Sequence, residues 1–276
     1  MTILVTGARG NIARSLVRQL LAAGLPVRAA GRDPAAAHLP DTVEVLRADL
    51  ADPGTLGPAL DGAGCVFLYA ERQGLGGFAE RARAAGVEHI VLLSAAGADA
   101  SSTDPIARLH GEAEETLAHS GIAWTFLRPG GFATNALQWA DAIRATGTVR
   151  DPFPESWGAP IHEADIAAVA LCALTEPGHE GTAPVLTGPE RLTRRRQAEL
   201  IGDAIGRPVA VDRQDLDEHR RDLARWGPPE VAEALIRHAV AAVDAPPPVT
   251  GDVQRVTGRA ARTFAAWARD HAGDFR

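Results

Sequence analysis

The feature that most constrains this chain is a turn with two glycines, which follows its first short apolar segment. Ile3–Val5 has the composition of a buried strand, and the next residues, Thr6-Gly-Ala-Arg-Gly-Asn-Ile-Ala13, lead into a helical pattern. Gly7 permits a tight turn, Gly10 lets the backbone approach a ligand closely, and Ala13 lets the helix pack against the strand. A strand, a glycine turn and a helix in this order predict a parallel α/β sheet whose first helix offers unpaired amides to an anion.

The same alternation continues through the first half of the chain. Gly24, Gly86 and Gly121 each follow a helical run, where a helix often ends in a left-handed residue. This spacing predicts an α/β fold with a Rossmann-type doubly wound parallel sheet, covered by helices on both faces. The predicted strands are Ile3–Val5, Val27–Ala30, Val43–Leu46, Cys65–Tyr69, Ile90–Leu93 and Trp124–Leu127, and the predicted helices between them are Asn11–Ala23, Thr55–Leu60, Phe78–Ala85 and Ala107–His119.

An arginine follows the second predicted strand, and this position indicates which dinucleotide the turn binds. Selective NAD sites place a carboxylate here for the ribose 2′-hydroxyl, whereas an arginine suits a 2′-phosphate. Arg32 can make a bidentate contact to phosphate, and Arg9 in the glycine turn can supply a second one. We therefore expect NADPH as cofactor. Asp33 keeps the alternative open, because a shift of one residue would make it the ribose ligand.

Further cofactor contacts are expected at the helix start and at the carboxyl ends of later strands. Asn11 and Ile12 carry the first amides of the helix, and Asp49 is placed to accept a hydrogen bond from the adenine amino group, although capping of a helix is an equally good role for it. The remaining predicted contacts lie at strand ends and are Leu50, Tyr69, Ala70, Pro129 and Gly130.

The composition excludes several classes of function. The net charge is −7, with 28 basic and 35 acidic residues, which gives no reason to expect nucleic acid or a membrane as a partner. Cys65 and Cys172 lie far apart, and His162-Glu163 does not form a zinc motif, so we expect neither disulfide nor metal. The chain starts without a basic leader, which predicts a cytoplasmic protein. We expect a monomer or a homodimer with a small-molecule substrate.

The pattern loosens after about Arg128, where helical stretches are joined by segments rich in proline and glycine. Asp244–Thr250 contains three consecutive prolines and indicates an extended connector. We expect residues 1–130 to form the NADP(H)-binding core. Residues 131–276 should form a small C-terminal α/β substrate and lid region packed on that core, not an independent domain. The helices predicted there are Ala133–Ala145, Glu163–Leu174, Arg195–Ile205, Pro229–Val243 and Ala260–His271.

Six stretches in the same order resemble the NmrA-like family of atypical short-chain dehydrogenase/reductases, including its NAD(P)H:quinone reductase branch. The resemblance implies a Rossmann core, a small C-terminal substrate region and NADPH as cofactor. It covers nearly the whole chain but leaves function open, because the family contains both reductases and regulators that bind the dinucleotide as a redox signal. The stretches are Val5–Ile12, Val27–Pro34, Gly86–Ser94, His110–Glu114, Thr125–Phe132 and Val256–Phe264.

The resemblance also implies which residues stand at the catalytic positions. Ordinary members of the superfamily combine a serine after the fifth strand with a Tyr-x-x-x-Lys pair on the next helix. Ser94 stands at the serine position, and alignment on Glu114 places Ile106 at the tyrosine and His110 at the lysine. The pair is absent, and the chain contains no lysine at all, since all 28 of its basic residues are arginine.

A reductase of this kind needs another source for the proton that follows the hydride. His110 can donate it, because imidazole titrates near neutral pH, or it can instead hold the nicotinamide ribose. Ser94 can hydrogen-bond the carbonyl oxygen. A substrate with a phenol beside its ketone can supply the proton itself. Phe132, Trp139 and Trp157 are candidates for the wall of the substrate site.

The function that these features predict is an NADPH-dependent reductase acting on a ketone or quinone, with a polycyclic aromatic compound as one class of substrate. Two alternatives stay open. One is a catalytically silent protein that senses NADP(H) and binds a partner, and the other is an isomerase or epimerase that uses its bound cofactor transiently.

Overall fold

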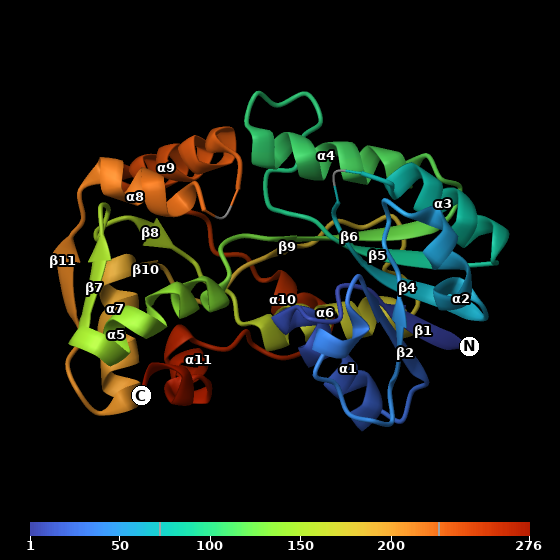
Figure 1. Cartoon of the computed structure of the whole chain (residues 1–276), viewed down its shortest axis with the longest axis horizontal. Helices are drawn as coiled ribbons and strands as arrows, with labels where there is room; N and C mark the ends of the chain where they lie inside the picture. Colours follow the sequence, from blue (N-terminus) through green and yellow to red (C-terminus); the bar gives the residue numbers. More distant parts are fainter. Residues whose placement is uncertain (72, 226) are drawn as a thin grey trace.

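The computed structural model describes residues 1–71, 73–225 and 227–276. Its main feature is a seven-stranded parallel sheet with the strand order β3-β2-β1-β4-β5-β6-β9 (Figure 1). The strand order reverses between β1 and β4, which is where doubly wound sheets bind their ligands. The predicted parallel α/β sheet is thus confirmed. The strands are β1 (Thr2–Val5), β2 (Val27–Gly31), β3 (Glu44–Arg47), β4 (Ala63–Tyr69), β5 (His89–Leu93), β6 (Ala123–Pro129) and β9 (Val185–Leu186).

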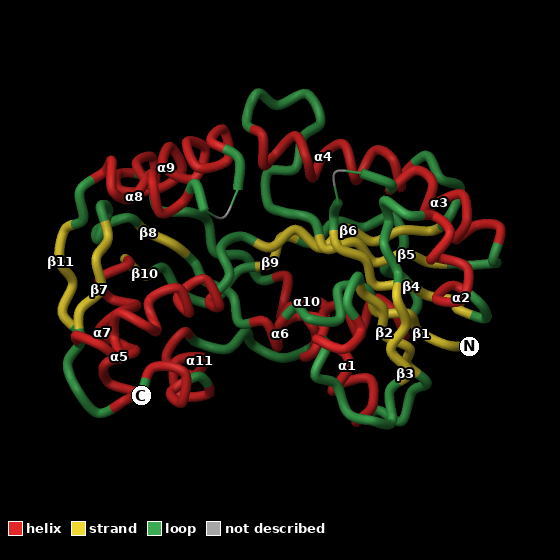
Figure 2. Tube along the Cα trace, viewed as in Figure 1, coloured by secondary structure: helices red, strands yellow, loops and turns green. Residues whose placement is uncertain are grey.

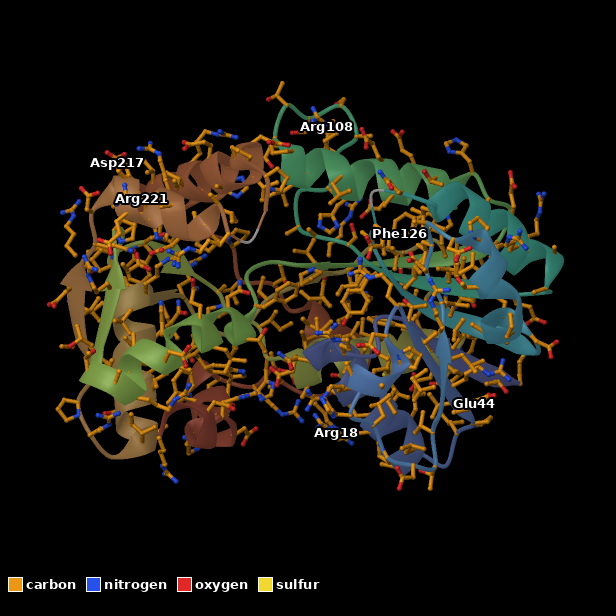
Figure 3. All side chains as sticks on the ribbon, viewed as in Figure 1. Arg18, Glu44, Arg108, Phe126, Asp217 and Arg221 are labelled. Atoms are coloured by element: carbon orange, nitrogen blue, oxygen red, sulfur yellow. The ribbon has the colours of Figure 1, made fainter. Side chains whose placement is uncertain are left out.

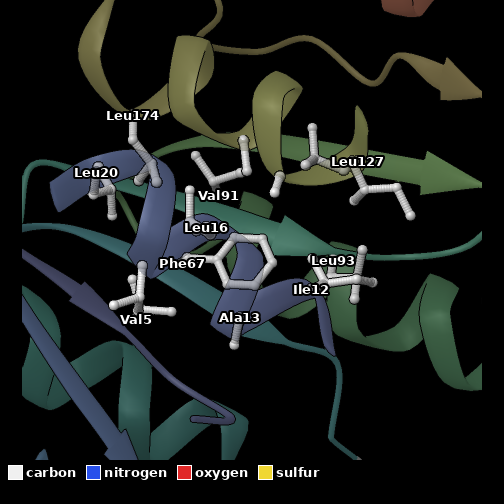
Figure 4. Packing of buried hydrophobic residues seen from close by; sticks show 14 of the residues in the cluster. Val5, Ile12, Ala13, Leu16, Leu20, Phe67, Val91, Leu93, Leu127 and Leu174 are labelled. Carbon is white, nitrogen blue, oxygen red and sulfur yellow. The ribbon is translucent and has the colours of Figure 1, made fainter. Parts of the chain in front are cut away.

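Alternate side chains of the central strands supply two separate cores, because successive residues of a strand point to opposite faces. Phe67 of β4 packs on one face near Leu16, whereas its neighbour Leu68 packs on the other face near Phe78. Figure 4 shows the first of these cores, to which Val5, Leu16 and Phe67 belong. Its covering helices are α1 (Asn11–Ala22) and α6 (Glu163–Thr175), and the opposite face is covered by α2 (Leu56–Leu60), α3 (Leu75–Ala84) and α4 (Pro105–Ala118).

The strands predicted from the sequence are all present, with ends shifted by one or two residues. Gly24, Gly86 and Gly121 have φ values of 71°, 83° and 78°, which confirms their prediction as left-handed residues after helices. A residue with a side chain would be strained at these three positions.

A second lobe is built from most of the chain after β6. Its core contains Ile143, Trp267 and Phe275, all fully buried. The strands of this lobe form two small sheets, β10 with β8 and β11 with β7. Its elements are η3 (Ala133–Trp139), α5 (Ala140–Thr146), β7 (Thr148–Asp151), β8 (Trp157–Gly158), β10 (Leu192–Thr193), α7 (Arg194–Ile205), β11 (Ala210–Arg213), α8 (Leu216–Leu223), α9 (Pro229–Asp244), α11 (Phe264–Asp270) and η4 (Ala272–Phe275).

The elements of this half differ from the predicted ones in two places. The helix predicted over Ala133–Ala145 begins as the 3-10 helix η3 and becomes α-helical only in α5. The helix predicted to start at Ala260 starts at Phe264, because the Thr263 side chain accepts a hydrogen bond from the Ala266 amide and so caps the helix there. The short helices α8 and α10 (Asp252–Thr257) and the strands β7 to β11 were not predicted.

The chain crosses between the two lobes repeatedly. After building η3, α5 and β7 it returns to the core with α6 and β9, leaves again for β10 to α9, and returns with α10 against α6 (Figure 2). Asp104, at the start of α4, accepts a hydrogen bond from His238 of α9 at 2.9 Å, which links the lobes on the side of α4. Three elements after residue 131 therefore complete the core sheet and its cover.

Charged side chains lie mostly at the periphery of both lobes. Figure 3 shows Arg18, Glu44, Arg108 and Arg221 on the outside, with Phe126 between the sheet and α4. Over the residues that the structure describes, no helix combines the length and apolar character needed to cross a membrane.

Candidate dinucleotide site and reaction edge

A cavity of about 760 Å³ opens at the carboxyl ends of β1, β2 and β4. This volume is in the range of small-molecule and cofactor sites. Its apolar wall includes Leu56, Leu60 and Phe78. These three were not predicted as site residues, because in the sequence they show only the apolar spacing of helices that pack on a core. The predicted cofactor residues that line the cavity are Gly7, Arg9, Gly10, Arg32, Asp49, Leu50, Tyr69 and Ala70.

The glycine turn is shaped around the side chain of Tyr69. Gly7 has φ +66°, and a Cβ atom placed there would lie 2.5 Å from Cδ2 of the Tyr69 ring. A Cβ atom on Gly10 would lie 2.6 Å from the Tyr69 hydroxyl. Both distances are too short for real atoms, so both positions need glycine while the ring lies on the turn. From the sequence, the need for glycine at positions 7 and 10 was attributed only to the tight turn and to the close approach of a ligand. The contact with the Tyr69 ring is an additional reason.

The start of α1 leaves two amides without a protein partner. Gly10 is the N-cap and has no side chain to cap the helix. The Ala13 amide donates to the Tyr69 hydroxyl at 3.2 Å. Among the hydrogen bonds of the described residues, the amides of Asn11 and Ile12 have no acceptor. These two N–H groups lie at the positive end of the helix dipole, where an anion is stabilised.

Two guanidinium groups at the cavity have no carboxylate partner in the described part of the chain. Arg28 is paired with Glu44, and Arg47 is paired with Asp52. Neither Arg9 nor Arg32 takes part in an ion pair of that kind, although both line the cavity. Cations left without a protein partner at a site are suited to bind a phosphate.

The alternative acidic residues also lie at this site. Asp33, which precedes a short 3-10 helix (η1, Pro34–Ala36), lines the same cavity as Arg32. Asp49 accepts a hydrogen bond from the Ala51 amide at 3.1 Å, so its side chain stabilises the turn after β3. This contact lies in a turn and does not cap a helix, since the next two helices have Asp52 and Thr55 at their N-caps. Asp49 also lines the cavity, where the adenine contact was predicted.

Backbone hydrogen bonds join the ends of β4, β5, β6 and β9 into one edge beyond this cavity. The Ala70 amide donates to the Leu93 carbonyl at 3.3 Å, and the Ser94 amide donates to the Leu127 carbonyl at 2.8 Å. The Gly130 amide donates to the Leu186 carbonyl at 2.9 Å. Ser94, Pro129 and Gly130 therefore follow Ala70 along the same edge of the sheet, although they do not line the cavity itself.

At this edge Ser94 belongs to a buried polar cluster. Its hydroxyl donates to Oε1 of Glu114 at 2.5 Å. Nε of Arg128 donates to the same oxygen at 2.9 Å, and Nη2 of Arg128 donates to the other oxygen of Glu114. The hydrogen bond to Glu114 raises the pKa of Arg128. The proton of Ser94 is thus held by Glu114, a partner that the sequence analysis used only as an alignment marker.

His110 lies one turn before Glu114 on α4 and is half-buried. Its Nδ1 atom is buried and has no hydrogen-bond partner among the described residues. Burial lowers the pKa of His110, against the opposing charge of Glu114. A buried polar atom without a partner costs free energy, so such an atom indicates a partner from outside the chain.

The three predicted wall residues have different surroundings. Phe132 precedes η3 and packs against the core on the α1 face, in a backbone bridge with Ile161. Trp139 is 7% exposed and belongs to the core of the second lobe. Trp157 of β8 is 37% exposed. Of the three, Phe132 lies nearest in the chain to the sheet edge with Gly130.

The residues present fit a phosphorylated dinucleotide. The cavity has the required size, and the glycine turn allows close approach. Within the described residues, two helix amides lack acceptors and two guanidinium groups lack carboxylate partners. Each of these features is what an anionic, elongated ligand needs at the carboxyl edge of a doubly wound sheet.

Comparison with known proteins agrees with this geometry. Residues 7–177, more than half of the chain, match the family model described as NAD(P)H-binding. The (4-alkanoyl-5-oxo-2,5-dihydrofuran-3-yl)methyl phosphate reductase of Streptomyces griseus is 39% identical over 284 residues, covering 99% of each chain. The NAD(P)H azoreductase of Xenophilus azovorans is 39% identical over 282 residues, also covering 99% of each chain.

Among solved structures, the NADPH-dependent quinone oxidoreductase of Escherichia coli in complex with NADPH is similar over nearly its whole length. It has a TM-score of 0.80 and 27% identity, covering 97% of this chain and 99% of that one. The predicted family and the predicted NAD(P)H cofactor are therefore confirmed. The chain belongs to the NAD(P)H-binding family, and it is an NAD(P)H-dependent oxidoreductase.

Proposed function

We propose that this chain is an NADPH-dependent reductase that transfers hydride to a ketone or quinone, including polycyclic aromatic ones, without a Tyr/Lys pair. The observation that carries the proposal is the cavity beside the glycine turn, where Arg9 and Arg32 have no carboxylate partner among the described residues. Two such cations suit the additional phosphate that distinguishes NADPH from NADH. When bound, NADPH supplies the hydride.

The proton is assigned to His110. Ser94 would have to break its hydrogen bond to Glu114 before it could donate to a substrate oxygen, whereas Nδ1 of His110 has no bond to break in the described structure. His110 is half-buried, so water competes less for its ring than at the surface. Ser94 then has the role of a fixed wall at the sheet edge, held in place by Glu114 and Arg128.

Substrate contacts are assigned to Phe132, with Gly130 and Pro129 beside the reacting end of the cofactor. Gly130 is held by its hydrogen bond to Leu186, so the backbone at this point is well fixed. We retain Trp157 as a substrate contact because its indole is partly exposed, and Trp139 as a residue that supports the wall from the core. Residues 131–276 outside α6, β9 and α10 form the corresponding substrate region.

The names of the relatives indicate which acceptors to test. They give an azo compound, a quinone and an alkanoyl-oxo-dihydrofuran phosphate as substrates of those proteins. The purified chain should be mixed with NADPH and a panel of quinones, aryl ketones, azo dyes and unsaturated lactones, while the loss of nicotinamide absorbance is followed. Parallel reactions with NADH measure the cofactor preference.

The expected result is turnover with at least one quinone or ketone, at a lower KM for NADPH than for NADH. Tight NADPH binding without consumption across the panel would reject the reductase proposal in favour of a dinucleotide sensor. Formation of a product without net oxidation of NADPH would indicate an isomerase instead.

A further inference from the structure

Tyr69, the only tyrosine of the chain, occupies an unusual place for a residue at the end of a central strand. Its ring lies on the glycine turn, and its hydroxyl caps α1 by accepting from the Ala13 amide at 3.2 Å. Gly10 provides no side-chain cap, so α1 gains one from Tyr69, which lies 56 positions after Ala13. The same ring lines the dinucleotide cavity.

The hydrogen of the Tyr69 hydroxyl is free for another partner. A phenol is both acceptor and donor, and the bond from Ala13 uses only its acceptor side. No acceptor for the O–H group is found among the described residues. Burial raises the pKa of Tyr69 to about 12, against the opposing effect of the Ala13 amide, so the phenol keeps its proton at neutral pH.

Two further backbone donors precede Ala13 in the first turn of α1. The amides of Asn11 and Ile12 have no acceptor in the described part of the chain, while the next amide, that of Ala13, donates to Tyr69. An oxyanion bound to the first two amides therefore lies next to the phenol that accepts from the third. A neutral donor aimed at a phosphate oxygen makes a charge-assisted hydrogen bond.

We infer that Tyr69 is a third donor to the cofactor diphosphate. Its hydroxyl donates to the phosphate at the start of α1 and at the same time accepts from the Ala13 amide, which caps that helix. This inference rests on the proposed NADPH function and assigns one further contact within it. The need for glycine at positions 7 and 10 follows, since a side chain at either position would displace the ring that carries the donor.

The test compares three ligands with Tyr69→Phe and wild type by isothermal titration. NADPH and 2′-phospho-ADP-ribose both carry the diphosphate, whereas adenosine 2′-monophosphate lacks it. Tyr69→Phe keeps the ring and removes only the hydroxyl. It should weaken the two diphosphate ligands about tenfold, as expected for one hydrogen bond to a charged group, and change the monophosphate less than about twofold.

A matched control removes a buried hydroxyl that does not line the cavity. Thr125 is 1% exposed and donates to the His179 carbonyl, so Thr125→Val measures how much affinity is lost through lower stability alone. It should leave the affinities for all three ligands unchanged. Thermal melting of each variant without ligand confirms that it is folded before titration.

Three results would overturn the inference. One is equal affinity of Tyr69→Phe and wild type for the diphosphate ligands, and another is an equal loss for all three ligands. The third is tighter binding by Tyr69→Phe, which would mean that the hydroxyl occupies the place of the phosphate. If wild type itself binds neither NADPH nor 2′-phospho-ADP-ribose, the proposed function fails, which is a distinct outcome.

Discussion

Arg128 and Glu114 form an ion pair that joins β6 to α4 at the sheet edge where Ser94 lies, with both carboxylate oxygens of Glu114 bonded to the guanidinium. The Glu114 side chain is 7% exposed and that of Arg128 is 31% exposed. One carboxylate oxygen also accepts the Ser94 hydroxyl. A single acidic side chain thus positions Ser94, which directly follows β5, and Arg128 of β6 relative to the helix that carries His110.

Replacement of Glu114 by glutamine should therefore destabilise the protein. Glu114→Gln leaves Arg128 without its charge partner in a largely buried setting, which we expect to cost about 1–3 kcal/mol, below the range for fully buried pairs because Arg128 retains some water contact. Urea unfolding measures the loss. Glu112→Gln is the control on the same helix. Its ion pair with Arg108 is exposed and long, at 3.9 Å, so its loss should cost little stability. Equal stability of both variants would contradict the prediction.

Replacement of His110 should slow the chemical step. His110→Gln removes the proposed proton donor, and we expect kcat to fall about a hundredfold with little change in the KM for NADPH. Steady-state kinetics with the best acceptor of the panel provides the measurement. A kcat within about threefold of wild type would instead favour proton transfer from the substrate itself.

The same residue predicts a pH dependence of the rate. Burial lowers the pKa of His110 from its ordinary value of 6.5, so the imidazolium form is populated only at lower pH. The kcat of wild type should therefore rise as the pH falls below 6.5, and this rise should be absent in His110→Gln. A rise of the same size in both proteins would exclude His110 as its origin.

Replacement of Arg32 should change the cofactor preference. Arg32→Ala removes one proposed contact to the 2′-phosphate, so the KM for NADPH should increase about tenfold while the KM for NADH changes less than twofold. Arg47→Ala is the matched control, because Arg47 pairs with Asp52 and does not line the cavity. If the two cofactors are affected equally, Asp33 becomes the better candidate for the ribose contact.

A cluster of polar side chains between the start of α6 and α11 predicts that the stability of the protein depends on pH. Glu163 accepts from the Trp267 indole at 3.1 Å and lies 2.8 Å from Nε2 of His271. Burial would raise the pKa of Glu163, but the imidazoles of His162 and His271 outweigh it and hold that pKa well below its usual range. Burial would lower the pKa of His271, but Glu163 and Asp274 outweigh it and raise that pKa.

The two pKa shifts make the folding stability fall at opposite ends of the pH range. The raised pKa of His271 contributes stability that is complete below 6.5 and is lost as the pH rises through the higher folded value. The lowered pKa of Glu163 contributes stability that is present above 4.5 and is lost as the pH falls toward its folded value. The thermal midpoint of wild type should therefore be higher at about pH 5.5 than at about pH 8.5, by a few degrees. His271→Gln should show a smaller difference, and an unchanged difference would contradict the assignment.

The core of the fold was predictable because its signals are local. The strand Cys65–Tyr69 and the helix Asn11–Ala23 each have the periodicity of their structure, and the glycines after helices mark where those helices end. The cavity residues Gly7, Arg9 and Arg32 were likewise identifiable, since their positions after strands place them at one edge of a parallel sheet.

Other features depend on contacts between distant residues, which no local pattern contains. The bond from Ala13 to Tyr69 joins residues 56 positions apart, and Thr263 shortens a helix whose apolar pattern begins earlier. Glu114 had a known place in the alignment, but its role in holding Ser94 and Arg128 depends on side-chain geometry. The second lobe escaped prediction in part because two-residue strands such as β8 and β10 are too short to show a period.

The repeated passage of the chain between its lobes limits how this enzyme can be rebuilt. A fragment ending at residue 130 would lack α6, so Phe67, Val91 and Leu127 would be left facing water on one side of the sheet. Because several separate segments tether the halves, grafting a foreign substrate lobe requires cuts on both sides of α6, β9 and α10 rather than one junction. Exchanges confined to β10–α9 preserve every element that supports the nucleotide fold.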